Sequence, residues 1–484
     1  MMEEFFPWEE KHGLIGDTLE GFAYWNYMRR DMYKSFRDDM DGILSPFFRN
    51  LNESDEKKSF SKRLGIAFDM LKMPGKSRKR NIDVLFICHS RRTEIDGKLV
   101  SVYTDFLTDY FPDSVTIERA GSGRPKGTPY TPELVYLDRL ELLSNIYLMG
   151  VRLFRKKRYL DIRKSLEEKL GAPLKELANE KGLHLNIRQI VDRTTRLFFS
   201  YKVKRPVLEN MLSALNPKVI VEVVGGSFDA KIINEIARER GIPTMELQHG
   251  TLGPTVMYPP GVDFPQFPAY YLVFSKFWKE FARFPIAEDH VLSVGFPYFE
   301  EQVKRFNAAA KEKSSKHRTR TVVFLSSPSY GKELSEEAAR FSALAGKKYH
   351  VIFKLHPKEM KDWQSRYSAL KDTEVEVIDR PEESVYGIFA RSDIQVGVES
   401  TAIYEGLAFS LDTFVMRLPQ AYLMEELCAR GFGVFVADAS ELMTAVENTD
   451  KTGKKDPGEF WEANAREKTV KAIRTVMGTS PKKE

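Results

Sequence analysis

Short apolar runs alternate with helical segments along most of this chain, and this alternation restricts the fold more than any other feature. Strand-like runs occupy 82–88, 115–118, 218–224, 244–247 and 270–274 in the first half, and 321–325, 351–353, 394–398 and 432–436 in the second. Such short apolar runs bounded by turn residues are typical of buried strands in parallel sheets. Two successive sets in 484 residues predict two doubly wound α/β domains.

The segment 394–409, IQVGVESTAIYEGLAF, combines a strand with a helix start. Its alternating Ile and Val residues predict a buried strand, and the small and apolar residues that follow predict a helix capped by Ser400 or Thr401. The unpaired N–H groups of a helix start attract anions, phosphate above all. Glu405 lies one turn after Thr401, where its carboxylate can accept hydrogen bonds from ribose hydroxyls. The alternative is an ordinary capped helix with a solvated glutamate.

A second motif lies upstream in the segment 349–358, YHVIFKLHPK. Its apolar residues predict a strand, and Lys354 and His356 follow just before the breaker Pro357. Such a strand presents cationic and neutral donors at the carboxyl edge of a sheet, where open α/β sheets bind ligands. The interval between His356 and Ser400 leaves room for one further βα unit, so both motifs are expected at the same edge.

A third motif, Gln248-His249-Gly250, follows the predicted strand 244–247 in the first half. Glu246, Gln248 and His249 are therefore expected at the ligand edge of that sheet. A histidine there can take a proton from a hydroxyl group or bind a phosphate. No Gly-x-Gly-x-x-Gly sequence follows the strands on either side, which argues against a dinucleotide cofactor.

Lys-x-His-Pro followed by Glu-Ser-Thr before a helix resembles the nucleotide-binding half of GT-B glycosyltransferases. The nearest resemblance is to bacterial capsule and surface-polysaccharide transferases of the sialyltransferase-like, Kdo-transferase-like and glycerophosphotransferase-like kinds, and it covers roughly residues 217–440. It is specific for architecture and weak for the group transferred. The resemblance implies that a nucleotide-sugar is held by Lys354, His356, Ser400, Thr401, Glu405, Ser326 and Ser327. It also places the Gln-His-Gly segment beside the cleft, with His249 as the candidate general base.

The first predicted strand, 82–88, contributes further candidates. Arg91 and Arg92 follow its carboxyl end, and together with Gln248 they are expected to bind the acceptor. A helix is expected after them, with its apolar face at Leu99, Val100, Tyr103, Phe106 and Leu107. Asp96-Gly97 resembles the acidic-acidic-Gly motif of bacterial sialyltransferases, in which an acidic residue is the general base, although Ile95 occupies the first position here. Asp96 and Glu246 are therefore reserve candidates for the base, and a plain turn residue is the alternative for Asp96.

Composition excludes several other classes. The two cysteines, Cys88 and Cys428, lie far apart, which argues against a disulfide framework or a zinc site. The Asp-x-Asp pattern of a metal site occurs at Asp39-Met40-Asp41, but it follows no apolar strand and is interpreted as a solvated helix face. We therefore predict no metal ligands. No cofactor is predicted either. No run approaches about 18 apolar residues, and the acidic start MMEEFFPWEE lacks a signal peptide, which predicts a cytoplasmic protein. A net charge of +5 gives no indication of nucleic-acid binding.

Two further segments have open interpretations. The aromatic residues of the first thirty positions predict a helical cap packed on the first domain, with a lipid or partner surface as the alternative. Residues 131–215 are expected to be mostly helical, and the basic sequence LFRKKRYLDIRK at 153–164 is either a solvated charged face or a helix that faces the inner membrane surface.

We therefore predict a GT-B fold, in which two Rossmann-like doubly wound domains face each other. Residues 1–75 form a helical extension, 76–290 an acceptor domain, 291–455 a nucleotide-sugar domain, and 456–484 a helix that crosses back with a tail. The predicted function is transfer of a sugar from a nucleotide-sugar to a glycan or lipid-linked glycan in bacterial surface-polysaccharide synthesis. The alternatives are a polyol-phosphate transferase of the CDP-glycerol type, a nucleotide-sugar 2-epimerase, and a non-catalytic nucleotide or glycan binder.

Overall fold

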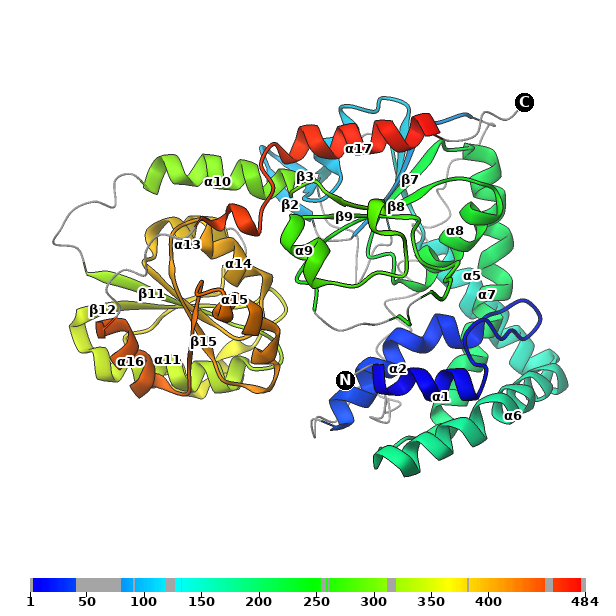
Figure 1. Ribbon diagram of the computed structural model, residues 1–484, viewed down its shortest axis with the longest axis horizontal. Coiled ribbons are helices and arrows are strands. Elements are labelled where there is room, and N and C mark those ends of the chain that lie inside the picture. Colours follow the sequence, from blue (N-terminus) through cyan, green and yellow to red (C-terminus); the bar gives the residue numbers. More distant parts are fainter. Residues whose placement is uncertain are drawn as a thin grey trace.

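Two parallel sheets, each covered by helices, form the body of the protein (Figure 1). The structure is a computed structural model, and it describes residues 3–40, 80–89, 92–118, 127–131, 133–253, 258–259, 261–310, 319–380, 383–448 and 456–479. Arg91 and part of the predicted amino-terminal extension lie outside the described residues.

The first sheet has seven strands in the order β10-β9-β8-β7-β1-β4-β6, and all six pairings are parallel. The strands are β1 (Val84–Cys88), β4 (Ser114–Glu118), β6 (Leu134–Tyr136), β7 (Val219–Val223), β8 (Thr244–Leu247), β9 (Tyr270–Val273) and β10 (Val291–Ser293). Every residue of β1, β7 and β8 is buried, because helices cover both faces. The predicted domain boundary at 290 falls just before β10, which pairs with β9, so the first sheet continues three residues further than predicted.

The second sheet has six strands in the order β13-β12-β11-β14-β15-β16, again all parallel. They are β11 (Arg320–Leu325), β12 (Tyr349–Lys354), β13 (Glu376–Ile378), β14 (Ile394–Gly397), β15 (Asp412–Met416) and β16 (Val434–Val436). Strands β11, β12, β14 and β16 match the predicted strands to within two residues, since short Val- and Ile-rich runs between turn residues form buried strands, whereas β13 and β15 were not predicted. The helices of this half are α10 (Pro297–Ala310), α11 (Gly331–Ala345), α12 (Trp363–Arg366), α13 (Val385–Arg391), α14 (Thr401–Leu407), α15 (Glu425–Ala429) and α16 (Ala439–Asn448). Short 3₁₀ turns are η5 (Gly346–Lys348), η6 (Ser368–Leu370), η7 (Pro419–Met424) and η8 (Pro457–Glu459).

The amino-terminal residues pack on the first domain as a helical cap. It consists of η1 (Glu3–Phe5), α1 (Phe6–Lys11) and α2 (Tyr24–Met40), and it contacts the long helices of that domain (Figure 1). The other helices of the first domain are α4 (Asp105–Thr108), α5 (Asp138–Phe154), α6 (Lys156–Lys181), α7 (Ile187–Leu215), α8 (Phe228–Glu239), α9 (Lys276–Phe281) and the 3₁₀ turn η3 (Glu288–His290). Trp8, Phe22, Trp25 and Tyr27 are buried in one cluster with α7, so the predicted packed cap is confirmed for the described residues.

A small third sheet replaces the helix that was expected after Arg92. The strands β2 (Arg92–Ile95) and β3 (Lys98–Ser101) form an antiparallel hairpin, and β5 (Thr128–Pro129) pairs with β3. Asp96 and Gly97 form the turn with φ angles of 50° and 73°. Two positive φ angles define the hairpin turn that Asp-Gly favours, so this local signal outweighed the apolar periodicity that predicted a helix. Only the short helix α4 remains of that prediction.

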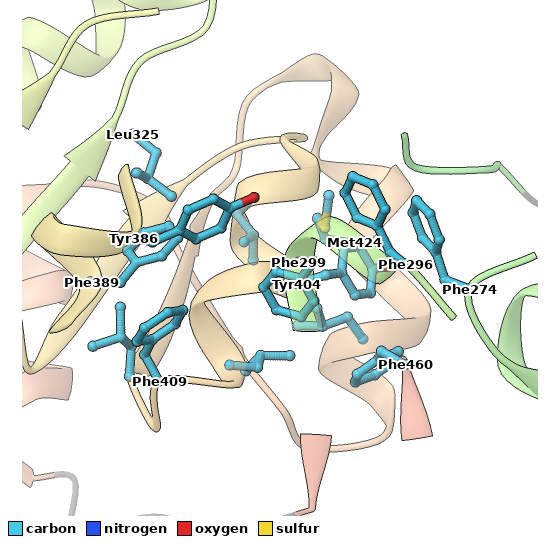
Figure 2. Close-up of a cluster of buried hydrophobic side chains, with 14 of the residues drawn as sticks. Phe274, Phe296, Phe299, Leu325, Tyr386, Phe389, Tyr404, Phe409, Met424 and Phe460 are labelled. Atoms are coloured by element: carbon cyan, nitrogen blue, oxygen red, sulfur yellow. The ribbon is translucent and has the colours of Figure 1, made fainter. Parts of the chain in front are cut away.

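The two domains meet in a shared aromatic cluster. Phe274 and Phe296 follow strands of the first sheet, and they lie beside Phe299, Tyr404 and Phe460 (Figure 2). The indole N–H of Trp461 donates to the Tyr404 carbonyl over 3.1 Å, and the Glu462 N–H donates to the Phe274 carbonyl over 2.8 Å. Burial of these rings removes apolar surface from water in both domains at once. The seam is therefore packed like a core.

The last helix, α17 (Ala465–Thr479), crosses back from the second domain onto the first, as predicted for this fold (Figure 1). It contacts α4, β7 and α10. Gly295 has a φ of 85° and touches the chain at Glu462 and Ala465, so any side chain at this position would clash with the start of the crossing. None of the described helices is long and apolar enough to span a membrane.

Candidate active site

The second sheet reverses its strand order between β11 and β14. Strands β12 and β13 lie on one side of β11 and strands β14 to β16 on the other, which is the 3-2-1-4-5-6 order of doubly wound folds. The crevice beyond the carboxyl ends of such a reversal is the ligand position. Ser326 and Ser327 follow β11, and Glu399 and Ser400 follow β14. The Ser327 hydroxyl donates to the Glu399 carboxylate over 3.2 Å, so these predicted phosphate-binding loops do meet at the reversal.

The His-Pro loop after β12 holds its imidazole in one orientation. The backbone N–H of Lys358 donates to Nδ1 of His356 over 3.2 Å. Nδ1 is then an acceptor, and Nε2 carries the proton of the neutral ring. The Glu359 carboxylate accepts from the backbone N–H of His356 over 3.0 Å, while the Glu359 N–H donates to the His356 carbonyl over 2.8 Å. The histidine thus presents an N–H donor at the sheet edge.

Glu359 is itself fixed by a buried partner. Its carboxylate is 1% exposed and accepts a hydrogen bond from the Tyr367 hydroxyl. A Cβ on Gly331, the first residue of α11, would clash with both groups. Glycine at this position therefore allows the start of α11 to lie against the Glu359–Tyr367 pair that supports the His356 loop. Sequence reasoning did not assign Glu359, although its position three residues after His356 was a usable signal.

Lys354 is the last residue of β12 and is almost fully buried. Burial lowers the pKa of its ammonium group, and the nearby carboxylates of Glu383 and Asp379 oppose that effect. The backbone carbonyl of Lys354 accepts from the Ser326 N–H over 3.0 Å. Lys354 thus lies at the carboxyl end of β12, next to the loop that follows β11.

Helix α14 begins where the sequence predicted. The Ser400 side chain caps it by accepting from the Ala402 N–H over 3.2 Å. Glu405 lies one turn later, beside two tyrosines of the seam. Burial and then Glu405 raise the pKa of Tyr298 to about 12, and the same two causes raise that of Tyr386 well above its usual value. Glu405 therefore lies toward Tyr298 of α10 and Tyr386 of α13.

The first sheet reverses its order between β1 and β7, and β8 is the next strand. His89 follows β1, and Gln248 and His249 follow β8. The Gln248 side chain is buried. Its Nε2 donates to the Gly250 carbonyl over 2.9 Å, and its Oε1 accepts from the Phe274 N–H over 2.8 Å. Gln248 was predicted to bind the acceptor; the structure instead commits both ends of its amide to the loop that carries His249.

Tyr103 connects the histidines of this edge. Its hydroxyl donates to the His249 carbonyl over 2.9 Å, and its ring lies 6.5 Å from the His249 ring and 6.4 Å from the His89 ring, both edge-on. Sequence reasoning assigned no role to His89 or Tyr103, because the contact joins residues 146 positions apart. No local pattern reports such a contact.

The His249 loop touches the second domain directly. The backbone N–H of Thr251 donates to Oγ1 of Thr401 over 2.9 Å, and the two threonine hydroxyls lie 2.8 Å apart. Thr401 begins α14, so the carboxyl edge of the first sheet meets the helix start of the second. The loop that carries the predicted base is therefore in contact with the helix start at which Ser400 and Thr401 were predicted to bind the donor.

Arg92 has another position than predicted, and Asp96 occupies the turn that was its alternative interpretation. The Arg92 guanidinium is 2% exposed and pairs with Glu118 over 2.6 Å and with Asp105 over 3.1 Å. A buried charge held by two carboxylates stays where it is, because exposing one partner leaves the others unpaired. Asp96 is exposed in the hairpin turn. Arg92 is thus an internal support rather than an acceptor ligand, and the turn interpretation of Asp96 holds.

Glu246 forms a buried pair with Glu222 on the neighbouring strand. Both carboxylates converge beside Gly225, where any side chain would clash with them. Burial raises the pKa of Glu246 to about 7, and burial with the charge of Glu246 raises that of Glu222 well above its usual value. Arg30 of α2 opposes the shift at Glu246. The pair lies on the sheet face opposite Met245 and Leu247, among α8 and the amino-terminal cap.

Among the described residues, no group of three or more His, Cys, Asp or Glu side chains is arranged to hold a metal ion. The expected independence from metals and cofactors rests on the sequence and stays a prediction.

Two facing Rossmann-like domains with parallel sheets, joined by a packed seam and a helix that crosses back, define a GT-B fold. No protein-family model matches the sequence, and no curated protein is detectably similar to it.

Similar folds occur among solved structures. UDP-GlcNAc 2-epimerase from Methanocaldococcus jannaschii is 11% identical with a TM-score of 0.46, over 82% of this chain and 100% of that one. The Neisseria meningitidis UDP-GlcNAc 2-epimerase bound to UDP-GlcNAc is 12% identical with a TM-score of 0.47, over 81% and 100%. The wall teichoic acid polymerase TagF is 11% identical with a TM-score of 0.45, over 88% and 98%. At these identities the likeness concerns the fold.

Proposed function

We propose that this protein is a glycosyltransferase that moves a sugar from a nucleotide-sugar to a glycan or lipid-linked glycan during assembly of a bacterial surface polysaccharide. The observation that carries the proposal is the contact between Thr251 and Thr401 across 2.9 Å. It joins the loop of His249, a histidine at one sheet edge, to the Ser-Thr helix start at the other. A proton acceptor and a set of phosphate-binding groups on opposite sides of one seam are what group transfer from a nucleotide requires.

The donor nucleotide would bind beyond β11, β12 and β14. In this proposal the Nε2–H of His356, the hydroxyls of Ser326 and Ser327, and the ammonium of Lys354 face the donor phosphates. Preorganised donors of this kind stabilise the negative charge that develops on a leaving nucleotide phosphate. Ser400 and Thr401 border the same position, and Glu405 would accept hydrogen bonds from the ribose hydroxyls.

The acceptor would enter from the first domain. His249 is the proposed general base, because an imidazole accepts a proton near neutral pH without any special environment. The proton leaves the acceptor hydroxyl for His249 as that oxygen forms its bond to the transferred sugar and the bond to the nucleotide phosphate breaks. Gln248 and Tyr103 hold the loop: Gln248 fixes the backbone on one side, and the Tyr103 hydroxyl binds the His249 carbonyl. Glu246 was the reserve candidate, but its carboxylate is buried beside Glu222 and Gly225 among α8 and the amino-terminal cap, so His249 is the favoured base.

The test is nucleotide release and product analysis with purified protein. It uses a panel of UDP-, GDP-, ADP- and CMP-linked sugars together with CDP-glycerol, each with and without a glycan acceptor. Release that needs an acceptor, with sugar found in the product, supports the proposal. Release only from CDP-glycerol would replace it with polyol-phosphate transfer, and isomerisation of the donor sugar without acceptor would replace it with epimerisation. Thermal stabilisation by nucleotides without any turnover would indicate a binder.

A further inference from the structure

Helix α5 has a second apolar face whose large side chains remain exposed among the described residues. One face packs against α7: Leu140 and Val151 are buried, and the Ser144 hydroxyl donates to the Ser200 hydroxyl over 2.8 Å. The other face carries large apolar side chains that are exposed, at the three- and four-residue spacing of a helix stripe. They are Leu143, Ile146, Leu153 and Phe154, with Tyr147 at the border of the two faces, where its ring lies 6.5 Å from that of Phe199 on α7.

Exposed apolar surface in this protein is concentrated here. Seven of the eleven large apolar side chains that are exposed in the described residues lie between positions 143 and 160. Leu153 is 70% exposed and Phe154 is 86% exposed, at the point where α5 ends and α6 begins. Scattered exposed apolar residues need no explanation, but a contiguous stripe marks a surface that binds something.

Cations surround the tip of this stripe. The sequence from 142 to 160 contains five basic residues and no acidic one. Arg158 pairs with Glu20 over 2.5 Å, and Arg152 lies over the Tyr159 ring at 5.1 Å. Arg155, Lys156 and Lys157 are exposed, and no carboxylate in the described part of the chain forms an ion pair with them. The tip therefore combines bulky apolar side chains with free positive charge.

We infer that the α5–α6 corner, defined by Leu143, Ile146, Tyr147, Leu153, Phe154, Lys156 and Lys157, docks on an anionic membrane surface. Apolar side chains can enter the boundary between headgroups and acyl chains while the neighbouring cations bind lipid phosphates. Charge complementarity favours this occupant over a second copy of the chain. A symmetric dimer through the same face would bring like-charged tips toward each other. The inference does not depend on the proposed transferase activity, since it rests on a surface of the first domain and not on the site at the seam.

Vesicle flotation tests the inference with full-length protein. The vesicles are phosphatidylcholine alone and phosphatidylcholine with phosphatidylglycerol at about three to one. We expect flotation with the mixed vesicles and little with neutral ones, and loss of flotation as salt is raised, because surface charges are screened. The double variants Leu153→Glu/Phe154→Glu and Lys156→Glu/Lys157→Glu should each lower the partition coefficient by at least about tenfold.

The matched control is Leu344→Glu/Lys347→Glu, which makes the same changes at exposed positions at the end of α11 in the second domain. It should float like the wild type. Equal flotation of the α5–α6 variants and this control would overturn the inference. Binding of the wild type that does not depend on lipid charge or salt would also overturn the inference. This measurement does not require any variant to fold. A concentration-dependent dimer in lipid-free solution that the α5–α6 variants abolish would assign the face to a second copy instead. Failure of the transferase assay leaves all these outcomes unchanged.

Discussion

The backbone N–H of Thr251 donates a hydrogen bond to Oγ1 of Thr401 across 2.9 Å. The donor lies four residues past the end of β8, and the acceptor begins α14, so this bond joins the carboxyl edges of the two sheets through residues 150 positions apart in sequence. It holds the loop that carries His249 against the start of α14.

Replacement of Thr401 by Val should impair turnover more than folding. Valine keeps the shape of threonine but removes the hydroxyl that contacts Thr251, and two lost hydrogen bonds of about 1 kcal/mol each correspond to a loss of roughly tenfold to thirtyfold. We expect that loss in kcat/KM for nucleotide release. Thr401→Ser keeps the hydroxyl and should behave nearly like the wild type. If Val and Ser variants have equal kinetics, the contact has no part in catalysis.

His249→Ala should lower kcat by about two to four decades while nucleotide affinity changes little, because a positioned base contributes on that order. Steady-state kinetics and nucleotide-induced thermal shifts measure the two quantities separately. His184, which is exposed on the loop between α6 and α7, supplies the control His184→Ala with wild-type kinetics. Loss of donor affinity would instead assign His249 to a phosphate. A normal kcat for His249→Ala with an inactive Glu246→Gln would transfer the role of base to Glu246.

His356→Ala should weaken nucleotide binding and leave the fold intact, because it removes the Nε2–H donor at the carboxyl end of β12. Loss of one hydrogen bond to a charged phosphate is expected to raise Kd by roughly tenfold or more. Calorimetric titration with the nucleotide measures it. The matched control is His350→Ala, at the opposite end of the same strand, where the imidazole pairs with Glu376 over 3.0 Å. Equal affinities in the two variants would remove His356 from the site.

Gly331→Ala should act on the same loop through its support. The added methyl group would clash with the Tyr367 hydroxyl and the Glu359 carboxylate, which hold the His356 backbone. We expect a destabilisation of about 1–3 kcal/mol, in line with overpacked sites, together with weaker nucleotide binding. The control is Gly346→Ala. A methyl group there meets open space, but the φ of 52° disfavours a side chain, so this variant measures the effect of backbone strain without a clash. A Gly331→Ala protein with unchanged nucleotide affinity would show that the support does not control His356.

Glu246 should make stability fall as the pH rises. Burial raises its pKa to about 7 in the folded protein, well above its usual value near 4.5, so the folded state holds a proton that the unfolded state releases. The resulting stabilisation is complete below about pH 4.5 and is lost as the pH rises through about 7. Glu246→Gln stays neutral. As the pH rises from about 4.5 to about 7, the free energy of unfolding of Glu246→Gln should therefore increase relative to that of the wild type, by up to about 1.4 kcal/mol per pH unit.

Denaturant unfolding of both proteins at pH 5, 6, 7 and 8 checks this dependence. The control Glu168→Gln removes an exposed carboxylate of α6 and should follow the wild-type profile. Parallel profiles for Glu246→Gln and the wild type would mean that Glu246 ionises as easily in the folded protein as in the unfolded one.

The sequence predicted four of the six strands of the second domain, and the helix start after β14, to within two residues, because both depend on local chemistry. Apolar β-branched runs form buried strands whatever surrounds them, and a hydroxyl residue before a helical segment caps it. Asp96-Gly97 shows the limit of that reasoning. The turn preference of this pair was recognised, but the apolar residues around it were assigned to a helix. The antiparallel pairing that begins at Lys98, directly after the turn, shows that a hairpin formed instead.

The sequence by itself determined the two doubly wound domains and the edge at which each motif lies, since strand direction and order place all carboxyl ends together. Only the tertiary structure decided which side chains at those edges are available. It buried Arg92 between Glu118 and Asp105, tied Gln248 into its own loop, and paired Glu246 with Glu222. It also brought Tyr103 to His249 and Thr251 to Thr401. The physical reason is that burial, ion pairing and pKa depend on partners that only the fold brings together, from 13 positions away for Arg92 and Asp105 to 150 for Thr251 and Thr401, and a local pattern carries no information about such partners.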